Sequence, residues 1–428
     1  MVEVIHKLRD VYGVGRDMPL NYVTRKDVDD EFISNLTRDK HIVIFGSSKQ
    51  GKTTLRKHCL NEDDYIVVSC LNTMSIDDLN GAILKAAGYQ IEQTQTRTIG
   101  GHLKYGAEFK GEGKVPLLAS ASGGGSIEKE NTNENSVEVK RLEIDLHDVN
   151  DIVISLKEIQ FKKFIVLEDF HYLPVQTQQD FSFALKAYHE NSDICFIVVG
   201  VWRDKNRLIY YNGDLTNRVA SVDADTWRKD SLAEVVSAGE YLLNIKFDEE
   251  TVERIIDNSA ESVSLLQEAC FKICERERVV ETQAQNKTVG RGVDVPALMR
   301  EIVNNQSGRY SAFITNFAEG FQQTEYDMYR WLIFVVLSVD AEDLQSGIRR
   351  NVFSKLIKEK HSSGEKLNEG NITQALQSSA SLQVTKNVRP IIIDYDQTTR
   401  VLNVVDRSFL IWLSMQNRAE LIQELGIA

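Results

Sequence analysis

The residues best suited to chemistry form one loop, between an apolar run at 42–45 and a helix-forming segment. The loop fits the pattern G-x-x-x-x-G-K-[ST], with the strand before it and the helix after it that this motif requires. Its residues are Gly46, Ser47, Ser48, Lys49, Gln50, Gly51, Lys52 and Thr53, followed by Thr54. Glycine leaves backbone N–H groups open to a phosphate, and the positive end of the helix points at the same anion. The stretch therefore predicts a phosphate-binding loop.

Two side chains of this loop can make contacts with a nucleotide and its metal ion that the backbone cannot make. Lys52 can reach the β- and γ-phosphates of a nucleotide, and the Thr53 hydroxyl can bind Mg²⁺. A second apolar strand pattern, which begins at Phe164, ends on two carboxylates, Glu168 and Asp169. Carboxylates at this place hold Mg²⁺ and orient the attacking water in enzymes with such a loop. We therefore expect ATP and Mg²⁺ as cofactors.

The order of the two carboxylates bears on their roles. Asp usually precedes Glu at the end of this strand, and here the order is reversed. By position, Glu168 takes the metal-side role and Asp169 polarises the water, although side-chain length could exchange the two. Because Asp reaches less far than Glu, we expect hydrolysis to be slow.

The elements that must position these residues alternate between strands and helices. Strand patterns cover 65–70, 164–171 and 194–200, and helix patterns cover 27–38, 75–87 and 148–160. This order predicts an α/β fold in which a parallel sheet carries helices on both faces. Apolar stripes at helical spacing then follow at 231–243, 248–257 and 262–280, and the stretch 281–294, which has no periodicity, indicates a linker.

Residues 92–146 interrupt this alternation. Glycine, serine and asparagine are frequent there, and apolar and polar residues alternate in patches such as 142–146. The pattern predicts a protruding β-hairpin or small sheet with a mobile tip near 119–136, and a disordered loop is the alternative. We expect this insert to be a recognition appendage.

The last part of the chain has its own pattern. Helix patterns at 326–339, 349–360 and 368–381 precede strand patterns at 389–395 and 400–405 and a last helix at 407–417. Three helices and a β-hairpin predict a winged helix. We therefore divide the chain into an ATPase core with its insert at 1–227, helices and a linker at 228–294, and a winged-helix domain at 295–428.

The charge of this last domain leaves its target open. Its candidate recognition helix, 368–381, has no Lys or Arg, and residues 321–428 hold 12 Lys and Arg against 13 Asp and Glu. Phosphate contacts normally supply most non-specific affinity for DNA. A local basic patch could still form from Arg349, Arg350, Lys386, Arg389 and Arg400. DNA binding, protein contact and an autoinhibitory brace therefore all stay open.

Three further motifs flank the phosphate-binding loop and its partner strand. They are Tyr22-Val23-Thr24-Arg25, Glu168-Asp169-Phe170-His171-Tyr172-Leu173 and Asp214-Leu215-Thr216-Asn217-Arg218-Val219. They resemble motifs of AAA+ ATPases in the branch that holds origin-recognition initiators and TniB-like transposition regulators. The resemblance implies an adenine pocket beside Arg25, a helical lid at 228–281, and an arginine finger, Arg218, that completes a neighbour's site. The alternatives are a solvated charge for Arg25 and a surface ion pair for Arg218.

Two positions depart from the pattern of that branch. The sensor-one position, usually Asn or Thr, reads Gly200-Val201-Trp202-Arg203. Ser262-Val263-Ser264-Leu265 stands where the lid usually carries a sensor-two arginine. Both departures favour low turnover. A winged helix after an ATPase also resembles STAND-type signalling ATPases.

The composition narrows the classes of protein further. A formal net charge of −13 disfavours a surface that grips phosphate backbones throughout. No apolar run approaches the ~20 residues of a membrane span, and the N-terminus has no signal-peptide core, so we expect a cytoplasmic protein without a membrane partner. The five cysteines include no CxxC pair, so the sequence predicts no zinc site.

Together these features predict a P-loop ATPase that acts as a molecular switch. ATP would order the subunit and promote assembly into a homo-oligomer or with a partner protein, and so regulate a DNA-processing reaction. The alternative is a signalling ATPase, for example in antiviral defence, that controls an effector on another chain.

Overall fold

The computed structural model describes residues 4–15, 17–99, 102–111, 126–132, 135–322 and 326–427 of the chain. At its centre lies a five-stranded parallel sheet with the strand order β2-β7-β8-β1-β9. The strands are β1 (His41–Phe45), β2 (Tyr65–Ser69), β7 (Phe164–Glu168), β8 (Phe196–Val199) and β9 (Val219–Asp223). Parallel strands end at the same edge of a sheet, which is where ligands bind in α/β folds. The phosphate-binding loop, called the P loop below, follows β1, and Glu168 ends β7. Both therefore lie at this edge, and β8 lies between their two strands.

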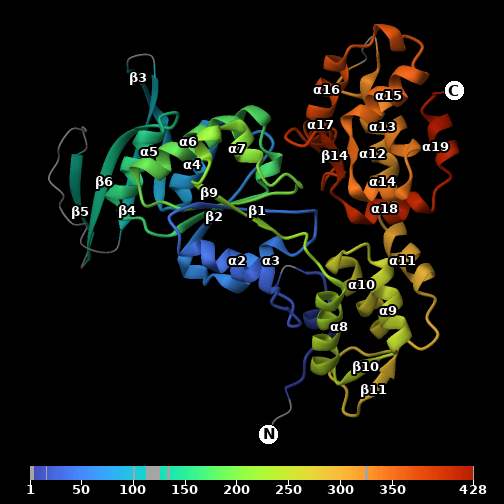
Figure 1. Cartoon of the computed structure of the whole chain (residues 1–428). Helices are drawn as coiled ribbons and strands as arrows, with labels where there is room; N and C mark the ends of the chain where they lie inside the picture. Colours follow the sequence, from blue (N-terminus) through green and yellow to red (C-terminus); the bar gives the residue numbers. More distant parts are fainter. Residues whose placement is uncertain are drawn as a thin grey trace.

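Helices cover both faces of the sheet (Figure 1). One face packs against α2 (Lys26–Leu36) and α3 (Lys52–Cys59), and the other against α4 (Ile76–Ala86), α5 (Val149–Glu158) and α6 (Val175–Asn191). Successive strand residues point to opposite faces, so β1 gives Ile44 to the first layer and Val43 to the second. A strand buried on both sides needs apolar residues throughout, which explains the unbroken apolar runs. The predicted α/β fold with a parallel sheet is confirmed.

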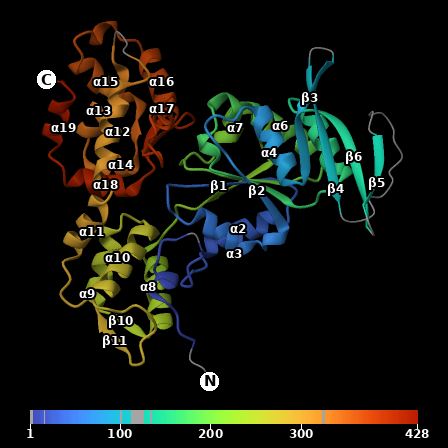
Figure 2. The ribbon, with the colours of Figure 1, turned by 180° about the vertical axis from the view of Figure 1, so that it is seen from behind.

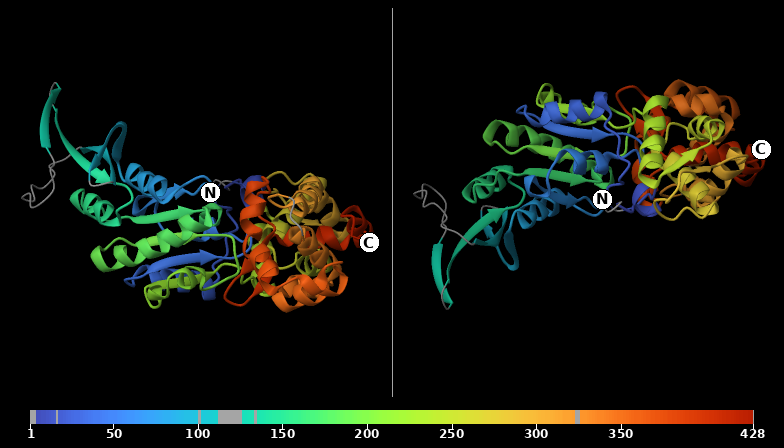
Figure 3. Two further views of the ribbon diagram at one scale, coloured as in Figure 1. Left: turned by 90° about the horizontal axis from the view of Figure 1, so that it is seen from above. Right: turned by 90° about the horizontal axis from the view of Figure 1, so that it is seen from below.

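The residues between α4 and α5 form a separate antiparallel sheet in the order β3-β4-β6-β5. Its strands are β3 (Tyr89–Ile99), β4 (His102–Gly111), β5 (Ser126–Thr132) and β6 (Asn135–Asp145). The sheet projects from the end of the core that lies farthest from the C-terminus (Figure 3). The sequence predicts a mobile tip at 119–136, and within it residues 119–125 and 133–134 lie outside the described residues.

A helical unit, called the lid below, lies beside the core. It contains α8 (Lys229–Leu243), α9 (Glu249–Asn258) and α10 (Val263–Arg276). The N-terminal helix α1 (Leu8–Val11) packs on α8, and the Tyr12 hydroxyl donates to the carbonyl of Val236 at 2.6 Å. The stretch expected to be a linker also belongs to the lid, because β11 (Lys287–Val289) pairs with β10 (Ile245–Phe247). Three paired residues are too few to show as a period in the sequence.

The C-terminal unit, residues 295–427, is mostly helical. Its helices are α11 (Val295–Asn304), α12 (Ser307–Glu319), α13 (Met328–Ser338), α14 (Ala341–Ser346), α15 (Arg350–Lys360), α16 (Glu369–Gln377), α17 (Ser379–Thr385), α18 (Arg407–Ser414) and α19 (Arg418–Glu424). An antiparallel sheet joins β12 (Ile348–Arg349), β14 (Val401–Val404) and β13 (Ile393–Asp396) in that order. The helix expected at 368–381 is interrupted at Ser378, and the strand expected from 389 begins only at Ile393.

The lid and the C-terminal unit lie one beyond the other at the same end of the core (Figures 1 and 2). They share one hydrophobic core, in which α11 packs against α9, α10 and α18. No helix in the described part of the chain has both the length and the apolar character needed to cross a bilayer.

Candidate nucleotide site

The P loop wraps around the amino end of α3. Gly51 has a φ of 80°, which glycine adopts without a steric penalty, and the helix begins at the next residue. The buried Lys52 ammonium group donates to the carbonyls of Gly46 at 3.0 Å and Ser47 at 2.6 Å. Because an ammonium group has three N–H bonds, one remains for a phosphate.

Burial also sets the charge of this lysine. It lowers the pKa of Lys52 to about 8, although the carboxylates of Asp225 and Asp169 act in the opposite direction. A phosphate beside the ammonium group would act in the same direction as these carboxylates, so binding of an anion keeps the lysine charged.

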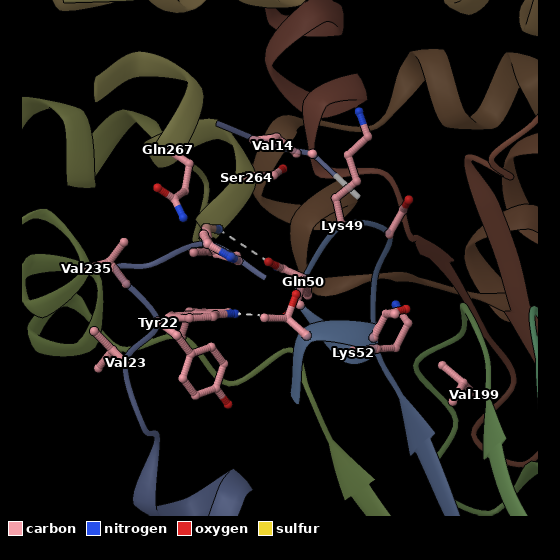
Figure 4. A pocket seen from close by; sticks show the side chains of 18 of the residues that line it. Val14, Tyr22, Val23, Lys49, Gln50, Lys52, Val199, Val235, Ser264 and Gln267 are labelled. Atoms are coloured by element: carbon pink, nitrogen blue, oxygen red, sulfur yellow. Dashed lines mark hydrogen bonds between the residues drawn. The ribbon is translucent and has the colours of Figure 1, made fainter. Parts of the chain in front are cut away.

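A cavity of about 300 Å³ opens beside the P loop (Figure 4). Its walls come from the N-terminal segment, the P loop, the ends of β7 and β8, and the lid. Away from the lysine it is lined by the apolar residues Val14, Pro19, Val23, Val235 and Val263 and by the polar residues Asn21, Ser264 and Gln267. A mostly apolar lining with a few polar groups is typical of a small-molecule site, and here it adjoins a phosphate-binding loop. The cavity thus has the two halves that a nucleotide needs.

Arg25, the residue expected beside the base, is 4% exposed and lines this cavity. Its Nη1 donates to the carbonyl of Ala224 at 2.9 Å, and its guanidinium carbon lies 4.2 Å from the centre of the Trp227 ring. The Trp227 indole N–H in turn donates to the carbonyl of Gln50 in the P loop at 3.3 Å. Arg25 therefore helps to hold the P loop, and the alternative of a solvated charge is wrong.

The two carboxylates at the end of β7 have different surroundings. Glu168 Oε2 accepts from the Thr53 hydroxyl at 3.5 Å, and Oε1 accepts from Arg56 Nε at 3.0 Å. Asp169 has a φ of 58° and lines the cavity, and its carboxylate has no hydrogen bond among the described residues. Burial raises the pKa of both carboxyl groups. The contact with Thr53 is compatible with a metal-side role for Glu168, and the division of roles between Glu168 and Asp169 stays a prediction.

The oxygen donors at this edge fit Mg²⁺. In nucleotide sites this ion is held by one or two carboxylates together with the phosphates of the substrate. The Thr53 hydroxyl and Glu168 would supply the protein's share. No group of three or more His, Cys, Asp or Glu among the described residues could hold a metal ion without help. The site thus fits a metal that arrives with the nucleotide.

Asp225, which sequence reasoning missed, is the main support of the P loop. It accepts from the Ser47 amide and from the Ser47 hydroxyl, both at 2.7 Å. It lies two residues after β9, which is the neighbour of β1 in the sheet. A carboxylate just after a strand next to the P-loop strand is the only signal in the sequence. That signal can be recognised only when the order of the strands in the sheet is known, and the sequence alone does not determine this order.

At the two positions that depart from the AAA+ pattern, the described residues that line the cavity carry no cation and no side-chain amide, and Arg203 instead lies 3.6 Å from Asp225. Gly200 and Val201 line the cavity, and the Val201 amide donates to Nδ1 of His171 at 3.3 Å. Burial lowers the pKa of His171 well below its usual value, so this ring is neutral. On the lid, Val263 and Ser264 line the cavity.

Arg218 lies away from its own subunit's cavity. It directly precedes β9, so it is at the amino edge of the sheet, opposite the edge that carries the P loop. Its Nη2 forms an ion pair with Glu190 at 2.8 Å, and its Nη1 donates to the carbonyl of Asp214. The ion pair given as the alternative for Arg218 is therefore present in the structure. The role of Arg218 as an arginine finger that acts on a neighbour stays a prediction.

The C-terminal unit touches the P loop directly. The Ser48 amide donates to the carbonyl of Val405 at 2.7 Å. Arg407, two residues on, donates through Nη1 to the carbonyl of Ala260 at 3.0 Å and to Glu261 at 2.9 Å in the lid, and its Nη2 lies 3.8 Å from Asp225. The lid holds the loop as well, because the Gln50 side chain donates to the carbonyl of Glu261 at 3.0 Å. Core, lid and C-terminal unit therefore meet at the P loop.

The β13–β14 hairpin makes a second contact with the core. Asp394 pairs with Arg207 at 2.8 Å in a contact that leaves the two side chains 1% and 12% exposed. Beside it, the Thr398 hydroxyl donates to Asp204 at 3.3 Å. Burial, with the Asp396 carboxylate nearby, raises the pKa of Asp204 to about 6. A small apolar cluster joins Val201 and Tyr172 of the core to Ala380, Val384, Ile391 and Val405 of the C-terminal unit.

No protein-family model and no curated protein sequence matches the chain. Solved structures are similar to it over most of its length. The ORC1 protein of Aeropyrum pernix in complex with DNA shares 11% identity with a TM-score of 0.45, covering 100% of this chain and 98% of that one. The Walker-type ATPase PABY2304 of Pyrococcus abyssi shares 11% with a TM-score of 0.48, covering 94% and 99%. Cdc6p of Pyrobaculum aerophilum shares 10% with a TM-score of 0.39, covering 97% of each chain.

At 11% identity or less, these likenesses concern the fold alone. The assignment of the fold itself rests on this chain. Its P loop follows one strand of a parallel sheet, its carboxylates end another, and a third strand lies between them. The chain has the α/β fold of a P-loop ATPase, built on a five-stranded parallel sheet.

Proposed function

We propose that this protein is an ATP-binding and slowly hydrolysing molecular switch, in which ATP changes how the C-terminal unit sits on the core. One observation carries the proposal: the Ser48 amide of the P loop donates to Val405 of the C-terminal unit. A ligand shifts a conformational equilibrium only if it binds the two states with different free energies. An amide that donates to Val405 is not free to donate to a phosphate oxygen, so nucleotide and docked C-terminal unit compete for the loop.

Slow hydrolysis follows from the site. Asp169 lines the cavity without a hydrogen bond to its carboxylate among the described residues, and it reaches less far than a glutamate. The described residues that line the cavity at the sensor positions carry no cation for the charge that develops on the phosphates, and such a cation is usually a large contribution to catalysis. A neighbour's Arg218 would supply such a cation in an assembly, so we expect turnover to rise when copies of the chain associate.

Docking on the core covers one residue of the local basic patch that could bind DNA. Two others are paired within the C-terminal unit itself, Arg350 with Glu369 at 2.8 Å and Lys386 with Glu319 at 3.0 Å. Arg389 lies over the ring of Tyr172 in the core, 5.2 Å from its centre. We therefore infer that a DNA or protein partner binds the C-terminal unit, as a winged helix, after ATP has released it. Neither the chain nor the similar structures named above favours the signalling alternative.

The test breaks the docked contact without touching the cavity. Asp394→Asn removes the counter-charge of the buried Arg207, which lies outside the cavity lining. We expect this variant to bind a non-hydrolysable ATP analogue about tenfold more tightly than the wild type, measured by calorimetry, because less docking free energy opposes binding. Glu369→Gln, which breaks ion pairs inside the C-terminal unit only, is the matched control. Equal affinity in all three proteins would contradict the proposed competition.

A further inference from the structure

Arg56 is a buried cation beside the nucleotide site to which the motif gives no role. We propose that Arg56 is a positioning residue for Glu168, and that its charge keeps the bound metal ion weakly held. The inference rests on the proposed ATP site and concerns the metal that accompanies the nucleotide. Arg56 lies four residues after Lys52 on α3, so both side chains leave the same face of the helix, toward the carboxylates at the end of β7.

The surroundings of Arg56 give it one counter-charge. Its side chain is 4% exposed, and its Nε donates to Glu168 Oε1 at 3.0 Å. Its guanidinium carbon lies 4.5 Å from the centre of the Tyr65 ring. Its Nη1 is buried and has no hydrogen-bond partner. Within the part of the chain that the structure describes, Glu168 is the only carboxylate with which Arg56 forms an ion pair.

This contact divides the two oxygens of Glu168. Oε1 is held by Arg56, and Oε2 stays at 3.5 Å from the Thr53 hydroxyl, on the side of the P loop. A planar guanidinium restricts the rotation of a carboxylate more than an ammonium group does, because its N–H directions are fixed. Arg56 therefore selects which oxygen of Glu168 is available at Thr53.

The same contact changes the charge at the metal site. A cation that binds near Thr53 meets the Glu168 carboxylate together with the Arg56 guanidinium, and the two have no net charge. The attraction to the carboxylate is therefore offset by repulsion from the guanidinium, which water screens little because the Arg56 side chain is 4% exposed. A purely structural salt bridge makes the opposite prediction for loss of the arginine, because disorder in Glu168 would weaken metal binding.

The sign of the effect on metal affinity separates these two roles. The measurement is Mn²⁺ binding, followed by the electron paramagnetic resonance of free Mn²⁺, in full-length protein saturated with a non-hydrolysable ATP analogue. We expect Arg56→Gln to bind Mn²⁺ about tenfold more tightly than the wild type, and Arg56→Lys, which keeps the charge, to stay within about twofold. Unchanged or weaker binding in Arg56→Gln would overturn the inference.

A second comparison applies even if Arg56→Gln does not fold. Arg56→Gln combined with Glu168→Gln leaves no unpaired buried charge, and it should bind Mn²⁺ about tenfold more tightly than Glu168→Gln alone. Equal affinity in these two proteins would overturn the inference.

Binding of the analogue without metal distinguishes failure of this inference from failure of the proposed function. A wild-type protein that binds no analogue contradicts the proposed function, whereas intact analogue binding with the wrong sign for Mn²⁺ contradicts only the role of Arg56.

Discussion

Two buried arginine–carboxylate pairs flank the nucleotide site, and they differ in what they join. Arg56–Glu168 lies inside the core, between α3 and the end of β7, and Arg207–Asp394 lies between the core and the C-terminal unit. The geometry is alike, with N–O distances of 3.0 Å and 2.8 Å and no side chain more than 14% exposed. Breaking the first leaves a charge that cannot leave the core, whereas the second can separate into water when the units part. The same chemistry thus builds a site in one place and a releasable contact in the other.

The largest effect is expected on ATP affinity, from a substitution in the core at the P loop. Lys52→Ala removes the ammonium group held over the P loop, and we expect it to weaken binding of ATP by at least about 100-fold. Lys85→Ala on α4 is the control, because its side chain is exposed and lies outside the cavity lining, and it should change affinity less than about threefold. Calorimetry with an ATP analogue measures both. Unchanged affinity in Lys52→Ala would refute the site.

The second largest effect is expected on the rate of hydrolysis, with ATP binding unchanged. Asp169→Asn should keep ATP bound and lower the hydrolysis rate by about 100-fold, because the water loses the carboxylate that orients it. The readout is phosphate release at saturating ATP. If Glu168→Gln stops hydrolysis while Asp169→Asn stays active, the roles of the two carboxylates are reversed.

Mixing two variants tests whether a second copy completes the site. Arg218→Ala keeps its own P loop, and Lys52→Ala keeps its arginine, so each should be nearly inactive alone. In a mixed assembly, the intact site of the first would meet the intact Arg218 of the second. We expect mixing to raise the hydrolysis rate several-fold over either protein alone. No gain at concentrations where the copies associate would leave Arg218 as the surface partner of Glu190.

These predictions differ in how far the sequence alone supports them. The P loop and the carboxylates can be predicted because they lie within short motifs whose spacing reflects local geometry, as Lys52 and Thr53 show. Asp225, Val405 and Asp394 could not be predicted, since each acts through contacts with residues more than 170 positions away. Their chemistry depends on strand order and on how the units dock, and neither leaves a period in the sequence. The insert's role stays a prediction for the same reason.

The smallest expected effect is on pH dependence at the releasable contact. Asp204 faces Asp394, Asp396, Arg207 and Thr398, and burial beside Asp396 raises its pKa to about 6. The docked state therefore binds this proton more tightly than the released state does, so docking is stronger at low pH and weakens as pH rises from about 4 to 6. Asp204→Asn should remove this dependence. Proteolysis of the freed C-terminal unit at pH 5 and pH 7 measures it, and an unchanged pH profile in the variant would exclude Asp204 as the cause.

The most direct measurement of the central claim, that ATP and the docked C-terminal unit compete, is the rate of disulfide formation between Asp204→Cys and Thr398→Cys. The two native side chains are in contact at 3.3 Å across the interface. Under mild oxidation, the pair should close quickly without nucleotide, and a saturating ATP analogue should slow closure by about tenfold or more. Adding Lys52→Ala should abolish the effect of the analogue. A closure rate that does not change when the protein is saturated with the analogue would contradict the account.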